Sequence, residues 1–132
     1  MAAGVNDAVS VPYPVSAVEL EALSPGNVRD AVCRIGESAV MRGSPKLYTL
    51  LRFLVEATLK GHAAELKETT IGVEAFGRAT DYDPKTDTVV RTQTWRLRRK
   101  LRTYYSAEGT SDPVLIEIPI GHYVPVFHSR GV

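Results

Sequence analysis

The segment that decides the fold is Val90-Arg91-Thr92-Gln93-Thr94-Trp95-Arg96-Leu97-Arg98-Arg99-Lys100-Leu101. Its apolar and small residues recur every three or four positions, which places them on one side of a helix. These residues are Val90, Thr94, Leu97 and Leu101, followed at the same spacing by Tyr104. Asp87 is suited to cap the start of the helix, and Gly109 to follow its end. We therefore expect a helix over 87–105 whose apolar side faces a core.

The opposite side of this predicted helix carries cations, hydroxyls and one aromatic ring. A rotation of about 100° per residue places the following residues outward or on the flanks: Thr88, Arg91, Thr92, Trp95, Arg96, Arg99 and Arg102. A helix fits the major groove of B-DNA, where Arg can donate to guanine O6 and N7 while other cations and hydroxyls bind phosphates. The pattern predicts a helix that reads double-stranded DNA.

The charge of the chain is segregated. The formal net charge is only +1, but 85–102 holds seven cations against one acid, 7 − 1 = +6. Residues 1–30 hold one cation against four acids, 1 − 4 = −3. A basic stretch of this kind is typical of a surface that binds phosphate.

A solvated helix surface is the alternative explanation of the arginine run, because runs of charge usually face water. Against it, the cations have almost no acidic partners three or four residues away, and like charges at that spacing repel. Trp95 would also be exposed unless something covers it. Two contacts remain open for its ring, one with a C-terminal hairpin and one with the DNA backbone.

Two further helices are predicted before residue 62. Ser24-Pro25 starts the first, which continues over about 25–37 with Val28, Val32 and Ile35 at helical spacing. Ser44-Pro45 starts the second, and Gly61 ends it. The second helix has the strongest apolar stripe in the chain, formed by Leu47, Leu50, Leu51, Leu54, Val55 and Leu59.

A brief third helix and a hairpin complete the pattern. After a linker over 62–67, Thr70 can cap a short helix that ends at Gly77. The segment 78–86 contains Asp81, Asp83 and Pro84 and predicts a turn-rich loop. The β-branched and aromatic runs at 114–118 and 123–127 predict a hairpin.

These elements predict a mostly α domain with a C-terminal β-hairpin, which is a winged helix-turn-helix with a three-helix core and an extra N-terminal helix. The expected organisation is a flexible tail or short edge strand over 1–23, an accessory helix and linker over 24–43, the winged domain over 44–128, and a tail over 129–132. The accessory helix has two alternatives: it mediates self-association, or it packs on the core.

The chain resembles the effector domains of OmpR/PhoB-type bacterial response regulators in two motifs separated by a gap: the segment 90–101 quoted above, which ends in Arg96-Leu97-Arg98-Arg99-Lys100-Leu101, and Ile116-Glu117-Ile118-Pro119-Ile120-Gly121-His122-Tyr123. The resemblance covers roughly 45–127. It implies that 47–60 is the first helix of the trihelical unit, 70–76 the positioning helix and 87–105 the recognition helix. It also implies that Arg96 reads bases, that Thr92, Trp95 and Arg98 lie near phosphates, and that the loop 78–86 can contact RNA polymerase.

The chain departs from that family in its first part and in its hairpin. Residues 1–43 contain a predicted helix where the family has a four-stranded sheet. The hairpin turn carries His122, which we include among the residues that contact DNA, but it has no Arg or Lys at its tip. The sequence contains no receiver domain with a phosphorylatable Asp.

The remaining features argue against other protein classes. No apolar run approaches the roughly 18 residues of a membrane span, and the N-terminus lacks the pattern of a secretory signal, so we expect a cytoplasmic protein. Cys33 is the only cysteine and is expected to be a small buried residue. The three histidines lack metal-ligand spacing, and no phosphate-binding glycine loop occurs. We expect no cofactor and no enzymatic activity.

The sequence therefore predicts a bacterial transcriptional regulator that binds double-stranded DNA as a homodimer or in tandem, because one helix reads only a few base pairs. The alternative is a protein-interaction module that presents the same basic face to RNA polymerase or to another acidic protein.

Overall fold

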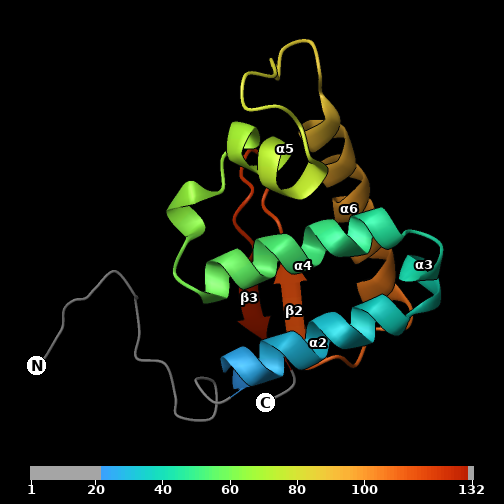
Figure 1. Cartoon of the computed structure of the whole chain (residues 1–132). Helices are drawn as coiled ribbons and strands as arrows, with labels where there is room; N and C mark the ends of the chain where they lie inside the picture. The colour runs from blue at the N-terminus through green and yellow to red at the C-terminus, as the bar shows by residue number, and fades with distance from the viewer. Residues whose placement is uncertain (1–21, 131–132) are drawn as a thin grey trace, which may run out of the picture.

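The computed structural model describes residues 22–130. Within them the chain is mostly helical and ends in a two-stranded antiparallel hairpin, which confirms the coarse prediction (Figure 1). The elements are α2 (Pro25–Glu37), α3 (Ala39–Arg42), α4 (Pro45–Leu59), a 3-10 helix (Ala63–Glu65), α5 (Glu68–Phe76), α6 (Val89–Ser106), β2 (Val114–Glu117) and β3 (Val126–Ser129). No helix in this range is both long and apolar enough to cross a membrane. Of the tail predicted over 1–23, residues 1–21 lie outside the described residues.

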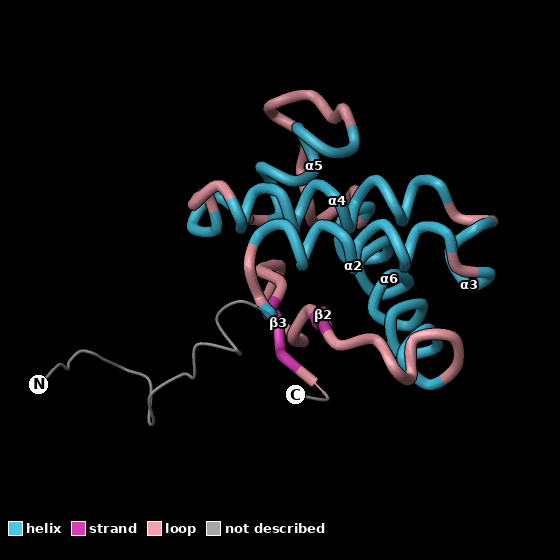
Figure 2. The backbone as a smooth tube through the Cα atoms, turned by 90° about the horizontal axis from the view of Figure 1, so that it is seen from below, coloured by secondary structure: helices cyan, strands magenta, loops and turns pink. Residues whose placement is uncertain are grey.

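Helices α2 and α4 lie side by side and run in opposite directions, connected by the short helix α3 (Figures 1 and 2). The Ser24 side chain caps α2 as predicted, accepting a hydrogen bond from the Asn27 amide at 3.2 Å. One face of α2 joins the same hydrophobic cluster as α4 and α6, through Val28, Ala31, Val32 and Ile35. The apolar side of this helix thus packs on the core, and self-association stays a prediction.

Helix α6 buries the side that its spacing predicts. Val90, Thr94 and Leu97 have no exposed surface, and Leu101 and Tyr104 are each 4% exposed. The helix packs against α4 and α5, with β2 near its C-terminal half. It begins at Val89, so its N-cap residue is Thr88 and not Asp87 as predicted. The Asp87 carboxylate accepts from the Val89 amide at 3.2 Å and from Arg78 Nε at 2.6 Å.

The short helices α5 and α3 differ from the prediction. Helix α5 begins at Glu68, so Thr70 lies inside it and does not cap it, whereas Gly77 ends it as expected with the left-handed φ of 67°. Helix α3 was not predicted. Its cap is Ser38, whose hydroxyl accepts from the Met41 amide at 3.3 Å. Ser44 precedes α4 as expected but forms no side-chain capping bond with that helix.

Cys33 is exposed, so the prediction of a buried thiol is wrong. The buried stripe of α2 passes through Val32 and Ile35. Because successive helical residues differ by about 100°, position 33 lies away from this stripe and faces solvent.

The second strand of the hairpin lies at 126–129 rather than at 123–127. Val114 pairs with Ser129 and Glu117 with Val126 in an antiparallel register. The longer connection turns at Gly121, which has φ 87°, and Pro125 precedes the strand without an N–H to donate. Of the tail predicted over 129–132, Ser129 belongs to β3 and the Arg130 guanidinium donates to the Gly109, Thr110 and Asp112 carbonyls, whereas 131–132 lie outside the described residues.

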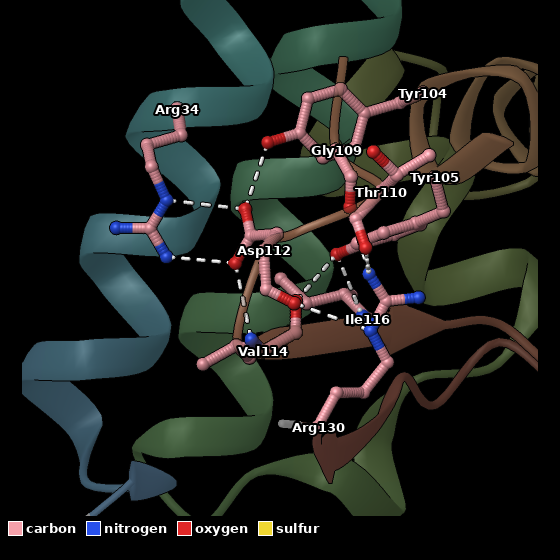
Figure 3. Close-up of polar contacts among 9 residues, drawn as sticks. All are labelled: Arg34, Tyr104, Tyr105, Gly109, Thr110, Asp112, Val114, Ile116 and Arg130. Atoms are coloured by element: carbon pink, nitrogen blue, oxygen red, sulfur yellow. Dashed lines mark hydrogen bonds and ion pairs between the residues drawn. The ribbon is translucent and has the colours of Figure 1, made fainter. Parts of the chain in front are cut away.

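A polar network around Asp112 connects α2, α6 and β2 (Figure 3). The Asp112 carboxylate accepts from Arg34 Nε at 3.1 Å and Nη2 at 2.9 Å, from the Tyr104 hydroxyl at 2.8 Å, and from the Val114 amide at 3.1 Å. Its side chain is 2% exposed. The Tyr105 hydroxyl donates to the Val114 carbonyl and accepts from the Ile116 amide, and so covers the free edge of β2.

Candidate nucleic-acid interface

The outward side of α6 brings together most of the predicted site residues. Those exposed on the helix or at its N-cap are Thr88, Arg91, Thr92, Trp95, Arg96, Arg99 and Arg102. They lie opposite the buried stripe because the apolar residues on the other side hold the helix on the core. His122 is exposed as well, in the loop between β2 and β3.

The central cations of this face are not neutralised by carboxylates. Arg96 and Arg102 form no hydrogen bond or ion pair with any residue between 22 and 130. The Arg99 guanidinium lies over the Trp95 ring, 4.9 Å from its centroid. A cation against a ring face keeps its full charge. This part of the helix thus presents positive charge and N–H donors to solvent.

Trp95 is 54% exposed. It lies in a groove between α6 and the turn from α3 to α4, whereas the hairpin borders a different groove beside Arg98 and Arg102. Packing of its ring on the hairpin, one of the two predicted alternatives, is therefore wrong. Contact with DNA remains the other alternative.

Arg91 and the two threonines occupy the N-terminal end of the face. Arg91 Nη2 donates to the Pro84 carbonyl at 2.7 Å, and its Nε lies 3.2 Å from the Glu68 carboxylate in an ion pair. The Thr88 and Thr92 hydroxyls lie 3.3 Å apart. Arg91 therefore holds the loop before α6 in place, and its charge is compensated by Glu68.

Arg98 has a different environment from the one predicted. Its Nε donates to the Ile118 carbonyl at 2.9 Å, and its Nη2 donates to the carbonyls of Pro119 at 3.2 Å and His122 at 2.8 Å. These bonds face the hairpin loop rather than solvent. The structure thus makes Arg98 the residue that fixes this loop on α6, in place of the expected phosphate contact.

We predict that Arg98→Ala lowers the free energy of unfolding by about 1–2 kcal/mol, because several charge-assisted bonds to carbonyls are lost and the half-buried carbonyls remain. Amide hydrogen exchange in 118–125 should also accelerate. Urea unfolding and exchange mass spectrometry measure the two effects. Arg102→Ala is the matched control on the same helix and should stay within about 0.5 kcal/mol of the parent. Equal stability of the two variants would contradict the role given to Arg98.

The structure adds Lys46 to the cations identified in α6 and gives Lys100 of that helix a partner. Lys46, at the start of α4, borders the groove that contains Trp95. Lys100 Nζ donates to the Val40 carbonyl at 3.1 Å and so connects α6 to α3. Lys46 carried no sequence signal, since it lies 50 residues from Arg96 and only the packing of α4 on α6 brings them to one surface.

Asp83 and His128 have local structural partners. Asp83 accepts from the Lys85 amide at 3.0 Å, which is the turn chemistry expected of the loop 78–86. His128 Nε2 lies 2.9 Å from the Glu117 carboxylate across the hairpin. Among residues 22–130, no group of three or more His, Cys, Asp or Glu side chains could hold a metal ion.

No family model, curated protein or solved structure matches this chain. The likeness to OmpR/PhoB-type effector domains therefore stays a prediction from the sequence motifs. Any assignment of function depends on the geometry and charge of α6 and its surroundings.

Proposed function

We propose that this chain is a winged helix-turn-helix domain that binds double-stranded DNA and acts in bacterial transcriptional regulation. The observation that carries the proposal is the set of uncompensated cations Arg96, Arg99 and Arg102 on the exposed side of α6. Exposed Arg and Lys without acidic partners attract phosphate, and Arg can also read guanine in the major groove.

The packing of the helices supports the winged-helix proposal. In it, α4, α5 and α6 form the trihelical unit, and the hairpin β2–β3 is the wing. Helices α4 and α5 both contact α6 on its buried side, which leaves the other side accessible to DNA. The Arg98 bonds to the hairpin loop would then hold the wing beside the recognition helix.

Within this proposal Arg96 reads a base, while Thr92, Trp95, Arg99 and Arg102 contact the backbone. Thr92 and Trp95 flank Arg96 on the exposed face, and hydroxyls and indole N–H groups are suitable donors to phosphate. One recognition helix covers only a few base pairs, so we propose two copies on half-sites about one helical turn apart.

A second candidate function is a protein-interaction module for RNA polymerase or another acidic partner. The observation that favours it is Ile120 in the hairpin loop, which is 82% exposed. An exposed Ile at the tip of a wing without Arg or Lys suits an apolar contact with protein better than a contact with phosphate.

Salt-dependent duplex binding tests the first candidate against the second. A DNA reader should lose affinity linearly in the logarithm of salt concentration. Arg96→Ala should reduce the preference for the selected duplex over a scrambled one by roughly tenfold. Arg102→Ala should weaken binding to both duplexes alike and reduce the salt slope, which is the slope of log affinity against log salt concentration, by about one. Fluorescence anisotropy with a duplex selected from random sequences measures these changes. If neither substitution alters binding, or if the parent protein ignores DNA at low salt, the interaction module is the better assignment.

A further inference from the structure

Two adjoining grooves run along one side of α6. The first lies between α6 and the turn from α3 to α4, and the second lies between the start of α4, the end of α5 and the start of α6. They share Pro45, Lys46 and Gln93 in their walls, so the two grooves adjoin at these residues. We call this surface the α4–α6 trough.

The α4–α6 trough is lined by cations and by no carboxylate among the described residues. Its cations are Lys46, Arg78, Arg96, Arg99 and Lys100. Arg78 is paired with Asp87 at 2.6 Å, and Lys100 is held by the Val40 carbonyl. Lys46 is exposed and forms no hydrogen bond or ion pair with residues 22–130, so its ammonium is available to an anion.

The start of α4 adds to this positive potential. Helix α4 has fifteen residues, and its N-cap Ser44 gives no side-chain bond to the first amides. Amides at a helix N-terminus carry partial positive charge and favour anions nearby. The walls of the trough therefore combine side-chain cations with a helix end of the same sign.

We propose that the α4–α6 trough binds the sugar-phosphate backbone of one DNA strand at the edge of the major groove, with Lys46 contacting a phosphate. This inference rests on the proposed function, because α6 must lie in the major groove for the backbone beside it to enter the trough. The trough shares Arg96 and Arg99 with the exposed face of α6, so one duplex can occupy both surfaces. An extended run of cations without acids matches a phosphodiester chain in charge and shape.

The test compares Lys46→Ala with Lys60→Ala. Both variants remove one positive charge from α4 or its cap, but Lys60 borders a separate groove that Glu56, Glu65 and Glu74 also line. Duplex affinity is measured by anisotropy over a range of salt concentrations. Lys46→Ala should lower affinity roughly fivefold to tenfold at 0.1 M salt and reduce the salt slope by about one, with base preference unchanged. Lys60→Ala should match the parent.

Gln93→Glu provides a second, nearly isosteric variant that places a carboxylate in the trough. It should weaken duplex binding by a similar or greater factor, while circular dichroism confirms an unchanged fold. If the parent binds duplex but Lys46→Ala and Gln93→Glu behave like Lys60→Ala, the trough proposal is overturned and the proposed function stands. If the parent fails to bind duplex, the proposed function fails, and the trough proposal falls with it. A third outcome also overturns the trough proposal. If the parent binds single-stranded DNA more tightly than duplex, and Lys46→Ala and Gln93→Glu weaken both ligands alike, the occupant of the trough is a single strand and not the backbone of a duplex.

Discussion

Replacement of Asp112 by Ala is expected to lower the free energy of unfolding by about 3 kcal/mol, a large share of the 5–15 kcal/mol typical of a domain. The substitution removes the acceptor of the Tyr104 hydroxyl and the Val114 amide, and each buried donor left without a partner costs about 1–3 kcal/mol. The Arg34 side chain is 43% exposed and can return to water, which keeps the loss at the lower end of the range of about 3–5 kcal/mol for a fully buried pair. The midpoint of urea unfolding at constant m-value measures the change.

Asp81→Ala is the control for this prediction. Asp81 is exposed in the loop before α6 and has no partner among residues 22–130. Its replacement should change stability by less than about 0.5 kcal/mol. If Asp112→Ala is as stable as Asp81→Ala, the network does not hold α2, α6 and β2 together.

The same carboxylate should make the stability depend on pH. Burial disfavours the charged form of Asp112, but the bonds from Arg34, the Val114 amide and Tyr104 outweigh burial and lower its pKa in the folded state. A lowered folded-state pKa means that the stabilisation is complete above the unfolded pKa of about 3.9 and is lost as pH falls through the folded value. Between pH 5 and pH 3 the parent should therefore lose more stability than Asp112→Ala. Parallel curves for the two proteins would contradict this account.

The sequence predicted those features that depend on local periodicity. The buried side of α6 follows from the spacing of Val90, Thr94 and Leu97, and the bounds of α2 follow from Ser24-Pro25 and its apolar stripe. Helix starts were less accurate, since α5 begins at Glu68, before Thr70, and the N-cap residue of α6 is Thr88 rather than Asp87.

Contacts between segments that are distant in the sequence could not be predicted from its periodicity. Arg98 belongs to the same basic run as Arg96 and Arg99, yet of the three it alone donates to the carbonyls of the hairpin loop. The hydrogen-bond partners of Asp112 come from three elements. Lys46 lies on the same surface as the α6 arginines only because α4 packs on α6. The arginine run thus predicted a basic face, but which arginines are available to DNA required the arrangement of the chain in space.

Reversal of charge at Arg96 and Arg99 should have the largest effect on DNA binding. In Arg96→Glu/Arg99→Glu the formal net charge changes from +1 to 1 − 4 = −3. Loss of the Arg99 phosphate contact costs roughly tenfold at 0.1 M salt. Loss of the Arg96 base contact costs about 1–3 kcal/mol, which is roughly another tenfold, and the added carboxylates repel the backbone further. We expect duplex affinity at 0.1 M salt to fall by at least about 100-fold in anisotropy titrations. Both positions are exposed on α6, so the fold should be retained.

The control for this variant must separate local charge from net charge. Arg52→Glu/Lys60→Glu also brings the chain to −3, but Arg52 lies in α4 and Lys60 is its C-cap residue, and both border a groove with Glu56, away from the exposed face of α6. If DNA enters at α6, this control should lose less than about tenfold, because charges more than a Debye length of about 10 Å from the backbone are screened at 0.1 M salt. An equal loss in both double variants would mean that the net charge of the domain attracts DNA without an oriented site. In that case α6 would no longer be the recognition helix, since its arginines would contribute no more than any other surface cation.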